Sequence, residues 1–217
     1  MKVQMKKFRA AAVLGGLAAV AMVGAQAQNL ILNGDFESPN MAPFGIASAT
    51  WTPPSTVGDG GGWLIEYGTF GVYNYLHKSY QPLAGNQSGF FNTAGTSISQ
   101  SFDSISGAAY TVGFTLGTLP GFQASSYAVG VNIQDTVTGN YILTKHAMGS
   151  SPATLGGGDS FSYSFAGTGN PLKLSFVSLD PYVAIDSVTV VPEPEVYALA
   201  AGLGLLAFAG YRRFRKS

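Results

Sequence analysis

Aromatic side chains are concentrated in one part of the sequence, between residues 51 and 80. Flat rings can stack on the C–H faces of sugars, and polar groups such as those of Glu66, Asn74 and Asn86 can hold sugar hydroxyls. One interpretation is therefore a glycan-binding platform on loops. Its candidate stacking residues are Trp63, Tyr67, Tyr73 and Tyr75, within a group that also includes Trp51, Phe70 and Tyr80. The alternative is that most of these rings fill the interior, because aromatic residues are common in strands.

Residues that often carry catalysis form no recognisable pattern. The two histidines, His77 and His146, make no His-x-x-x-His pair, and no Gly-x-Ser-x-Gly sequence marks a nucleophile turn. Carboxylates are sparse and scattered, whereas glycoside hydrolysis needs a pair of them. The glycine runs at 58–62 and 156–158 lack the lysine and the strand–helix setting of a phosphate-binding loop. The sequence thus predicts that the protein is not an enzyme.

Charge is segregated along the 217 residues, although the formal net charge is +0. Four basic side chains lie before residue 10 and four after residue 211, whereas the part from Asp35 to Asp186 has three basic and nine acidic ones. A weakly acidic surface repels phosphate backbones, which argues against nucleic acid as a partner. Cysteine is absent, so a disulfide framework and a thiol nucleophile are excluded.

Short runs in which apolar and polar residues alternate recur from Asn29 to Val191, and no run there has helical periodicity. Alternation with period two predicts half-buried antiparallel strands. The expected strands are NLIL (29–32), SISQSF (97–102), AYTVGFTLG (109–117), YAVGVNIQD (127–135), NYILT (140–144), DSFSYSF (159–165), LKLSFVSL (172–179) and VAIDSVTVV (183–191). The segment DTVTGN (135–140) is expected to close a hairpin, and AGNQSGF (84–90) to be a loop. These features predict an all-β sandwich of about eight strands after a long irregular N-terminal region.

The first 27 residues have the features of a secretory signal peptide. A cationic start is followed by an apolar stretch from about Ala10 to Val23 and then by the small residues Ala25 and Ala27. Cleavage by signal peptidase is expected between Ala27 and Gln28. A retained membrane anchor is the alternative, but the apolar run is short for one.

The C-terminal end combines an apolar segment with a basic tail. Val196–Tyr211 contains 16 residues without charge, and as a helix it would extend about 24 Å, slightly less than the hydrocarbon core of a bilayer. The basic residues that follow favour a cytoplasmic end. The sequence therefore predicts a single transmembrane helix at 196–211, with the domain on the outer side of the inner membrane.

The same end resembles the PEP-CTERM sorting signal. Pro192, Glu193 and Pro194 match its Pro-Glu-Pro motif, and Arg212 and Arg213 match its basic terminus. The resemblance covers about the last 26 residues and implies that exosortase, a membrane enzyme, cuts near the motif in Gram-negative bacteria that make extracellular polysaccharide. The tail is also known as an ice-binding protein C-terminal domain, but nothing else in the sequence indicates ice binding.

The middle of the chain resembles the galactose-binding-like jelly rolls, which include carbohydrate-binding modules and the DUF642 group. The resemblance rests on NLILNGDFE (29–37), on SISQSFDSISGAAYTVGFTLG (97–117) and on AIDSVTVV (184–191), in the order of that family. Ser187 departs from the usual Asn or Asp, and the segment 69–81 matches no part of the pattern. The resemblance implies a jelly-roll β-sandwich.

The jelly-roll resemblance also implies a structural calcium ion. In modules of this kind, an acid of the opening motif and one near the last strand share the ion, and the corresponding residues are Glu37 and Asp186. Calcium takes six to eight oxygen ligands, so loop carbonyls and Asp35 or Asn33 would have to contribute. The alternative is a hydrogen-bonded pair that caps a loop, with Asp186 accepting backbone N–H groups.

Together these features predict three parts: a signal peptide (1–27), a β-sandwich domain (28–191) and a sorting segment (192–217). The expected function is that of an exported, non-enzymatic protein of the cell surface or of the extracellular matrix of a biofilm. Its role would be structural or adhesive, with extracellular polysaccharide as a partner. A dedicated carbohydrate-binding protein is the first alternative, and a surface hydrolase is the second.

Overall fold

The computed structural model describes residues 28–42, 48–58, 62–76, 81–119, 126–153 and 157–193, together with Gly202 and Gly204. By their internal contacts the residues divide into two units, one comprising Asn29–Val191 and the other comprising Met1–Gln28 with Pro192–Ser217. The first unit contains the described strands, and the following account concerns that unit.

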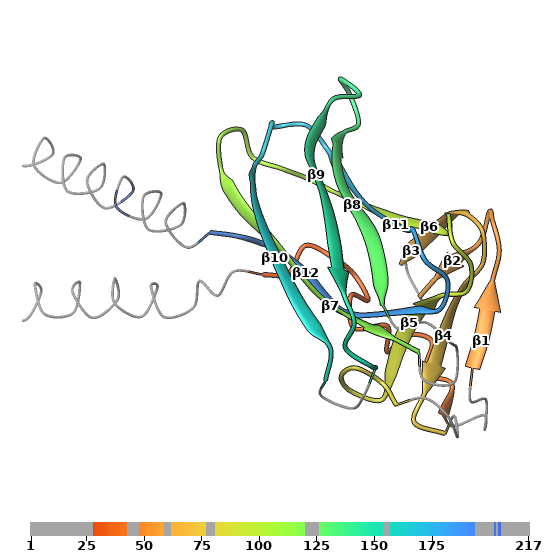
Figure 1. Cartoon of the computed structure of the whole chain (residues 1–217). Coiled ribbons are helices and arrows are strands. Elements are labelled where there is room, and N and C mark those ends of the chain that lie inside the picture. The colour runs from red at the N-terminus through yellow and green to blue at the C-terminus, as the bar shows by residue number, and fades with distance from the viewer. Residues whose placement is uncertain are drawn as a thin grey trace, which may run out of the picture. The chain divides into compact units, whose positions relative to one another are not determined.

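Twelve strands make up the first unit (Figure 1). They are β1 (Ser48–Trp51), β2 (Thr56–Val57), β3 (Trp63–Tyr67), β4 (Phe70–Asn74), β5 (Gln87–Phe91), β6 (Ser97–Phe102), β7 (Ala109–Thr118), β8 (Tyr127–Asp135), β9 (Tyr141–Gly149), β10 (Asp159–Ala166), β11 (Leu172–Ser178) and β12 (Val183–Pro192). They form two six-stranded sheets, sheet A in the order β1-β4-β5-β12-β7-β10 and sheet B in the order β2-β3-β6-β11-β8-β9. Every strand pairing with a defined register is antiparallel.

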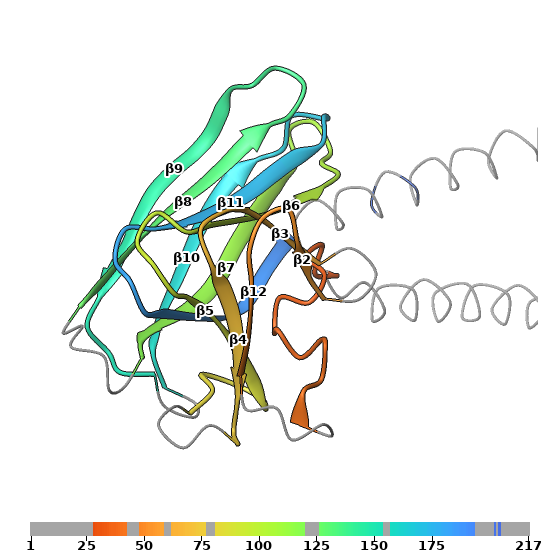
Figure 2. The same cartoon turned by 90° about the vertical axis from the view of Figure 1, so that its right-hand side faces the viewer.

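The two sheets pack face to face (Figure 2), which confirms the predicted all-β jelly-roll sandwich. Alternation explains the packing, because successive side chains of a strand point to opposite faces of the sheet. In β7, for example, Tyr110, Val112, Phe114 and Leu116 are buried, whereas the residues between them are more exposed. The hydrophobic effect on these inward rows drives the association of the sheets.

Aromatic rings cross the interior from one sheet to the other. Trp63 of sheet B packs against Phe36, which in turn contacts Phe70 of sheet A at a centroid distance of 5.6 Å. On its other side Trp63 contacts Phe176, and Phe176 meets Phe114 of sheet A edge-on at 5.0 Å. Such ring pairs add specific contacts to the free energy gained by burial.

The strand prediction was incomplete in the N-terminal half. β1 to β4 lie in a part of the chain that was expected to be irregular, and residues 87–91 form β5 rather than part of a loop. Residues 29–32 are not a strand, but the segment runs beside β12, where Leu30 N donates to Val190 O at 2.9 Å. β1 to β4 have two to five residues each, which is too short for alternation to be recognised. The predicted hairpin at 135–140 does join β8 to β9.

Candidate functional site

Two of the four expected stacking residues belong to the core. Trp63 is fully buried, and its Nε1 donates a hydrogen bond to the backbone oxygen of Asn33 at 3.1 Å. Tyr73 is also fully buried, and its hydroxyl donates to the backbone oxygen of Gln81 at 3.2 Å. Both side chains occupy inward positions of short strands, so neither ring has a face to offer a sugar. These two rings fill the interior of the domain, as the alternative interpretation of the aromatic residues expects.

The other two expected rings are exposed but lie apart. Tyr67 ends β3 with 68% of its surface exposed, and Tyr75 follows β4 with 58% exposed. Because β4 lies between them in the chain, the two rings are at opposite ends of that strand and do not form one platform. Among the expected polar partners, Asn74 is buried, whereas Glu66 and Asn86 are exposed. His77 and Tyr80 lie outside the described residues.

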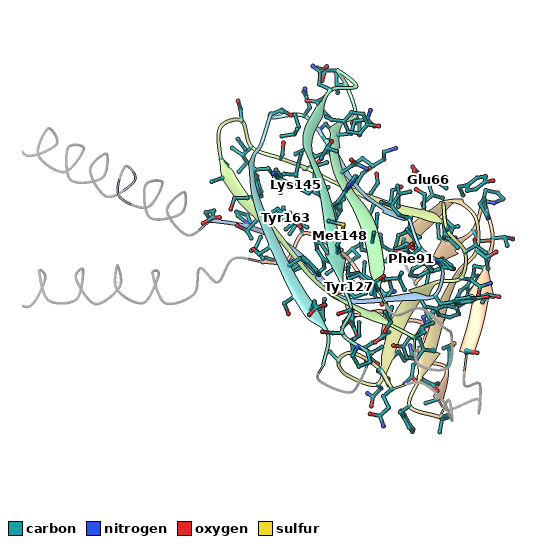
Figure 3. All side chains as sticks on the ribbon, viewed as in Figure 1. Glu66, Phe91, Tyr127, Lys145, Met148 and Tyr163 are labelled. Carbon is teal, nitrogen blue, oxygen red and sulfur yellow. The ribbon has the colours of Figure 1, made fainter. Side chains whose placement is uncertain are left out.

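Glu66 belongs instead to the outer face of sheet B, the face that points away from the core. One row of outward residues crosses five strands in register, and it consists of Leu64, Ser99, Ser175, Asn132 and Thr144. With strands about 4.8 Å apart, this row is roughly 19 Å long. The strands therefore form a rigid, extended surface. Leu64, Asn132 and Thr144 are accessible along this row, whereas Ser99 and Ser175 in its middle are buried. Figure 3 labels Glu66 on the β3 side of this face and Met148 on β9.

An ion pair crosses β6 on this face. Lys173 Nζ of β11 lies 3.0 Å from Glu66 Oε1 of β3, and both side chains are about one-third exposed, at 31% and 32%. From the strand between them, Ser99 Oγ donates to Glu66 Oε1 at 3.0 Å and Ser97 Oγ donates to Oε2 at 3.3 Å. Partial burial raises the pKa of Glu66, but the hydrogen bonds and the charge of Lys173 outweigh it and lower the pKa. Glu66 is therefore a charged and well-oriented acceptor.

A second outward row lies beside the ion pair. Ser97, Val177, Gly130 and His146 follow one another from β6 to β9. Gly130 has no side chain, and a Cβ there would lie 3.9 Å from the Val177 side chain and 4.0 Å from the His146 ring. His146 is exposed, so an imidazole borders this part of the face.

The sequence contains a signal for this face that the aromatic pattern obscured. The serines at 97, 99 and 101 alternate in β6 with Ile98, Gln100 and Phe102, which places the three hydroxyls on the outward face, although only Ser101 is exposed. Which charged residues flank these serines depends on strand order, because β3 and β11 are 107 residues apart at Glu66 and Lys173. Strand order was not available from the sequence.

The structure brings Glu37 and Asp186 to the same loop. Glu37 Oε1 accepts hydrogen bonds from the backbone N of Asn86 at 2.5 Å and of Gln87 at 3.0 Å. Asp186 Oδ2 accepts from Ala84 N at 3.0 Å, and its Oδ1 accepts from the next backbone N in β12 at 2.6 Å. The described residues contain no group of three or more His, Cys, Asp or Glu side chains that could hold a metal ion. Both carboxylates therefore accept backbone hydrogen bonds, which is the arrangement that the capping alternative describes.

Burial shifts the protonation of Asp186. The residue is fully buried, and this burial, together with the charge of nearby Glu37, raises the pKa of Asp186 to about 7. Hydrogen bonds from Ser88, Ser187 and Ala84 act in the opposite direction. The two carboxylates are thus close enough to repel each other. The loop between them supplies hydrogen-bond donors that offset part of this repulsion.

Most of the expected routing residues lie outside the described residues. These are Ala25, Ala27, Pro194, Arg212, Arg213 and the segment 196–211, apart from Gly202 and Gly204. Pro192 is described and is the buried last residue of β12, and Glu193 follows it. No helix among the described residues has the length and apolar character needed to cross a membrane.

No family model matches the chain, and no curated protein matches it either. Among solved structures, the chain is similar to TmCBM61 in complex with β-1,4-galactotriose, at 14% identity and a TM-score of 0.46, over 77% of this chain and 100% of that one. It is also similar to a CBM4 structure, at 14% identity and a TM-score of 0.41, over 75% of this chain and 99% of that one. A third match is a family 35 carbohydrate-binding module from Clostridium thermocellum, at 13% identity and a TM-score of 0.39, over 66% of this chain and 90% of that one. Identities and TM-scores this low do not bear on what the chain binds.

Proposed function

We propose that the domain Asn29–Val191 is a non-enzymatic module that binds polysaccharide on the outer face of sheet B. The observation that carries the proposal is the Glu66–Lys173 pair, which is held in place across β6 beside the exposed ring of Tyr67. The pair offers a strong acceptor and a strong donor for hydroxyl groups, and the ring offers a flat apolar surface. Together they match the two kinds of surface that a sugar presents, its hydroxyl groups and its C–H faces.

The extended shape of the face favours a polymer as the ligand. The row from Leu64 to Thr144 crosses five strands and is roughly 19 Å long. Its two end residues are exposed, so a ligand that reaches both of them must be longer than one sugar ring. Side chains on strands are held more precisely than those on loops, which lowers the entropy lost on binding. The proposed ligand is therefore an internal stretch of a polysaccharide chain.

Hydrolysis is not part of the proposal. Glycoside hydrolysis needs two carboxyl groups about 5–9.5 Å apart, one of which must be protonated to act as an acid. Among the residues of the ion pair and of the two outward rows described above, Glu66 is the acid, and its lowered pKa keeps it ionised. A charged Glu66 can accept hydrogen bonds from a sugar, but it cannot donate a proton to a leaving group.

The cellular setting is proposed from the sequence of the two ends. The signal-peptide features support export through signal peptidase, and the resemblance at residues 192–217 supports sorting by exosortase after transient insertion in the inner membrane. In that setting the module would act at the cell surface or in the matrix, as an adhesive component that holds extracellular polysaccharide.

The test is affinity electrophoresis of the exported protein in gels that contain a panel of polysaccharides. The variants are Tyr67→Ala and, as a matched control, Tyr75→Ala, because both rings are exposed but only Tyr67 lies at the end of a sheet B strand. Tyr67→Ala is expected to weaken retention about tenfold, the equivalent of about 1.4 kcal/mol, while Tyr75→Ala leaves retention unchanged. If Tyr75→Ala weakens retention and Tyr67→Ala does not, the polysaccharide binds at the β4–β5 connection and not on the outer face of sheet B. Migration of the wild-type protein unaffected by every polysaccharide would reject the proposed function.

A further inference from the structure

The loop before β5 is held by two carboxylates that come from opposite ends of the domain. Asp186, in β12, accepts hydrogen bonds from Ala84 N at 3.0 Å and from the Ser88 hydroxyl at 2.5 Å. Glu37, in the first described segment, accepts from Asn86 N at 2.5 Å and from Gln87 N at 3.0 Å. Four donors from five consecutive residues therefore point toward these two side chains.

Most carboxylate oxygens of Glu37 and Asp186 already accept hydrogen bonds from backbone N–H groups, which cannot serve as ligands of a cation. Three of the four oxygens accept hydrogen bonds: Glu37 Oε1, Asp186 Oδ1 and Asp186 Oδ2. Amide hydrogens carry partial positive charge and would repel calcium, which needs six to eight oxygen ligands. In addition, a Cβ on Gly85 would lie 2.2 Å from Glu37 Oε1, so the loop backbone packs directly against this oxygen and leaves no space for an ion between them.

We infer that Glu37 and Asp186 form a metal-independent clamp, in which backbone amides of residues 84–87 take the place of the calcium ion implied by the jelly-roll resemblance. Amides and hydroxyls that donate to a carboxylate stabilise it as a cation does, through charge-assisted hydrogen bonds. The clamp therefore offsets part of the cost of burying Asp186 without a ligand from solution.

The clamp also fastens the N-terminal segment. The Gln87 side chain donates from Nε2 to the backbone oxygens of Phe36 and Pro39, each at 2.9 Å, and accepts from Met41 N at 2.8 Å. Gln87 is fully buried, so these bonds are shielded from water. The same loop thus links the first segment of the domain to its last strand, and loss of the clamp would loosen both.

The test compares thermal unfolding of the exported protein in millimolar calcium and in excess chelator, together with calorimetric titration of the protein with calcium chloride. The expected result is a melting temperature that is the same in both solutions and a titration without binding heat. An ion that bound the folded protein alone would raise the melting temperature. A melting temperature that rises with calcium and falls again with chelator would overturn the inference, whatever the variants show.

The variants separate the clamp from general effects of charge removal. Glu37→Ala removes the acceptor of two backbone amides and is expected to lower the melting temperature by about 4 °C or more, equally with calcium and with chelator. Asp35→Ala is the matched control, because the only described hydrogen bond of the Asp35 side chain is a long one of 3.4 Å, which it accepts from Glu37 N. The melting temperature of this variant should stay close to that of the wild type. Equal melting temperatures for Glu37→Ala and the wild type would also overturn the inference. If Glu37→Ala does not fold, Glu37→Gln keeps one acceptor oxygen and should fold with no response to calcium.

Discussion

The rings of Phe36 and Trp63 stack at a centroid distance of 5.9 Å and an interplanar angle of 23°. Phe36 belongs to the segment before the first strand, and Trp63 begins β3, so this contact joins the N-terminal motif to sheet B. Phe36 has a positive φ of 53°, a backbone conformation that is uncommon for an aromatic residue, and its side chain is fully buried. The N-terminal motif is therefore part of the core.

Phe36→Ala should destabilise the domain strongly. Removal of a fully buried ring costs about 3–5 kcal/mol in free energy of unfolding, because the apolar surface and the contacts with Trp63 and Phe70 are lost. Urea unfolding followed by tryptophan fluorescence would measure the loss. Leu32→Ala is the control, since Leu32 in the same segment is 55% exposed and should change the free energy by less than about 0.5 kcal/mol. Equal losses for the two variants would contradict the core position of Phe36.

Lys173→Met should separate binding from stability. The Lys173–Glu66 pair is one-third exposed, and ion pairs of this kind contribute about 0–1 kcal/mol to folding. The free energy of unfolding should therefore change little, while affinity for a retained polysaccharide should fall about tenfold because a charged donor is lost. Affinity electrophoresis and urea unfolding of the same preparation would measure both. Lys145→Met in β9 is the matched control, and a similar loss of affinity there would indicate a general effect of positive charge.

Asp135 should make stability depend on pH in the acid range. Hydrogen bonds from the backbone of Thr138 and from the Asn170 side chain hold the pKa of Asp135 well below the ordinary value of 3.8. A depressed pKa in the folded state contributes stability above the unfolded pKa, and this contribution is lost as pH falls from about 4 toward the folded pKa. The difference in free energy of unfolding between wild type and Asp135→Asn should thus be full at pH 6 to 7 and shrink below about pH 4. A difference that is constant with pH would exclude this role.

Processing of the C-terminal end should leave β12 intact. β12 lies between β5 and β7 in sheet A, and Val190 is fully buried and accepts a hydrogen bond from Leu30. If the tail is removed after export, the mature C-terminus should lie beyond Val190, since a cut before it would remove part of an interior strand. Mass spectrometry of the exported protein would locate the end. A stable, folded product that ends before Val190 would contradict the position of β12.

The sequence by itself determined the fold class and the inward face of the longer strands. β7, β8 and β12 have nine or ten residues each, and alternation over that length specifies which side chains enter the core. The short strands of the N-terminal half do not carry enough periods for such a prediction. This is also why Trp63 and Tyr73 were candidates for a platform, since residue type alone does not distinguish a buried ring from an exposed one.

Only the tertiary structure decided which residues meet. Glu66 and Lys173 are 107 residues apart in the sequence. They meet because the strand order places β3 and β11 on either side of β6, across which the two side chains reach each other. Glu37 and Asp186 were paired by a resemblance, but the hydrogen bonds that fill the space between them come from the loop at 84–88. The physical reason is that strand order and loop path follow from the packing of the whole sandwich, whereas the local pattern of a strand records only which of its faces is buried.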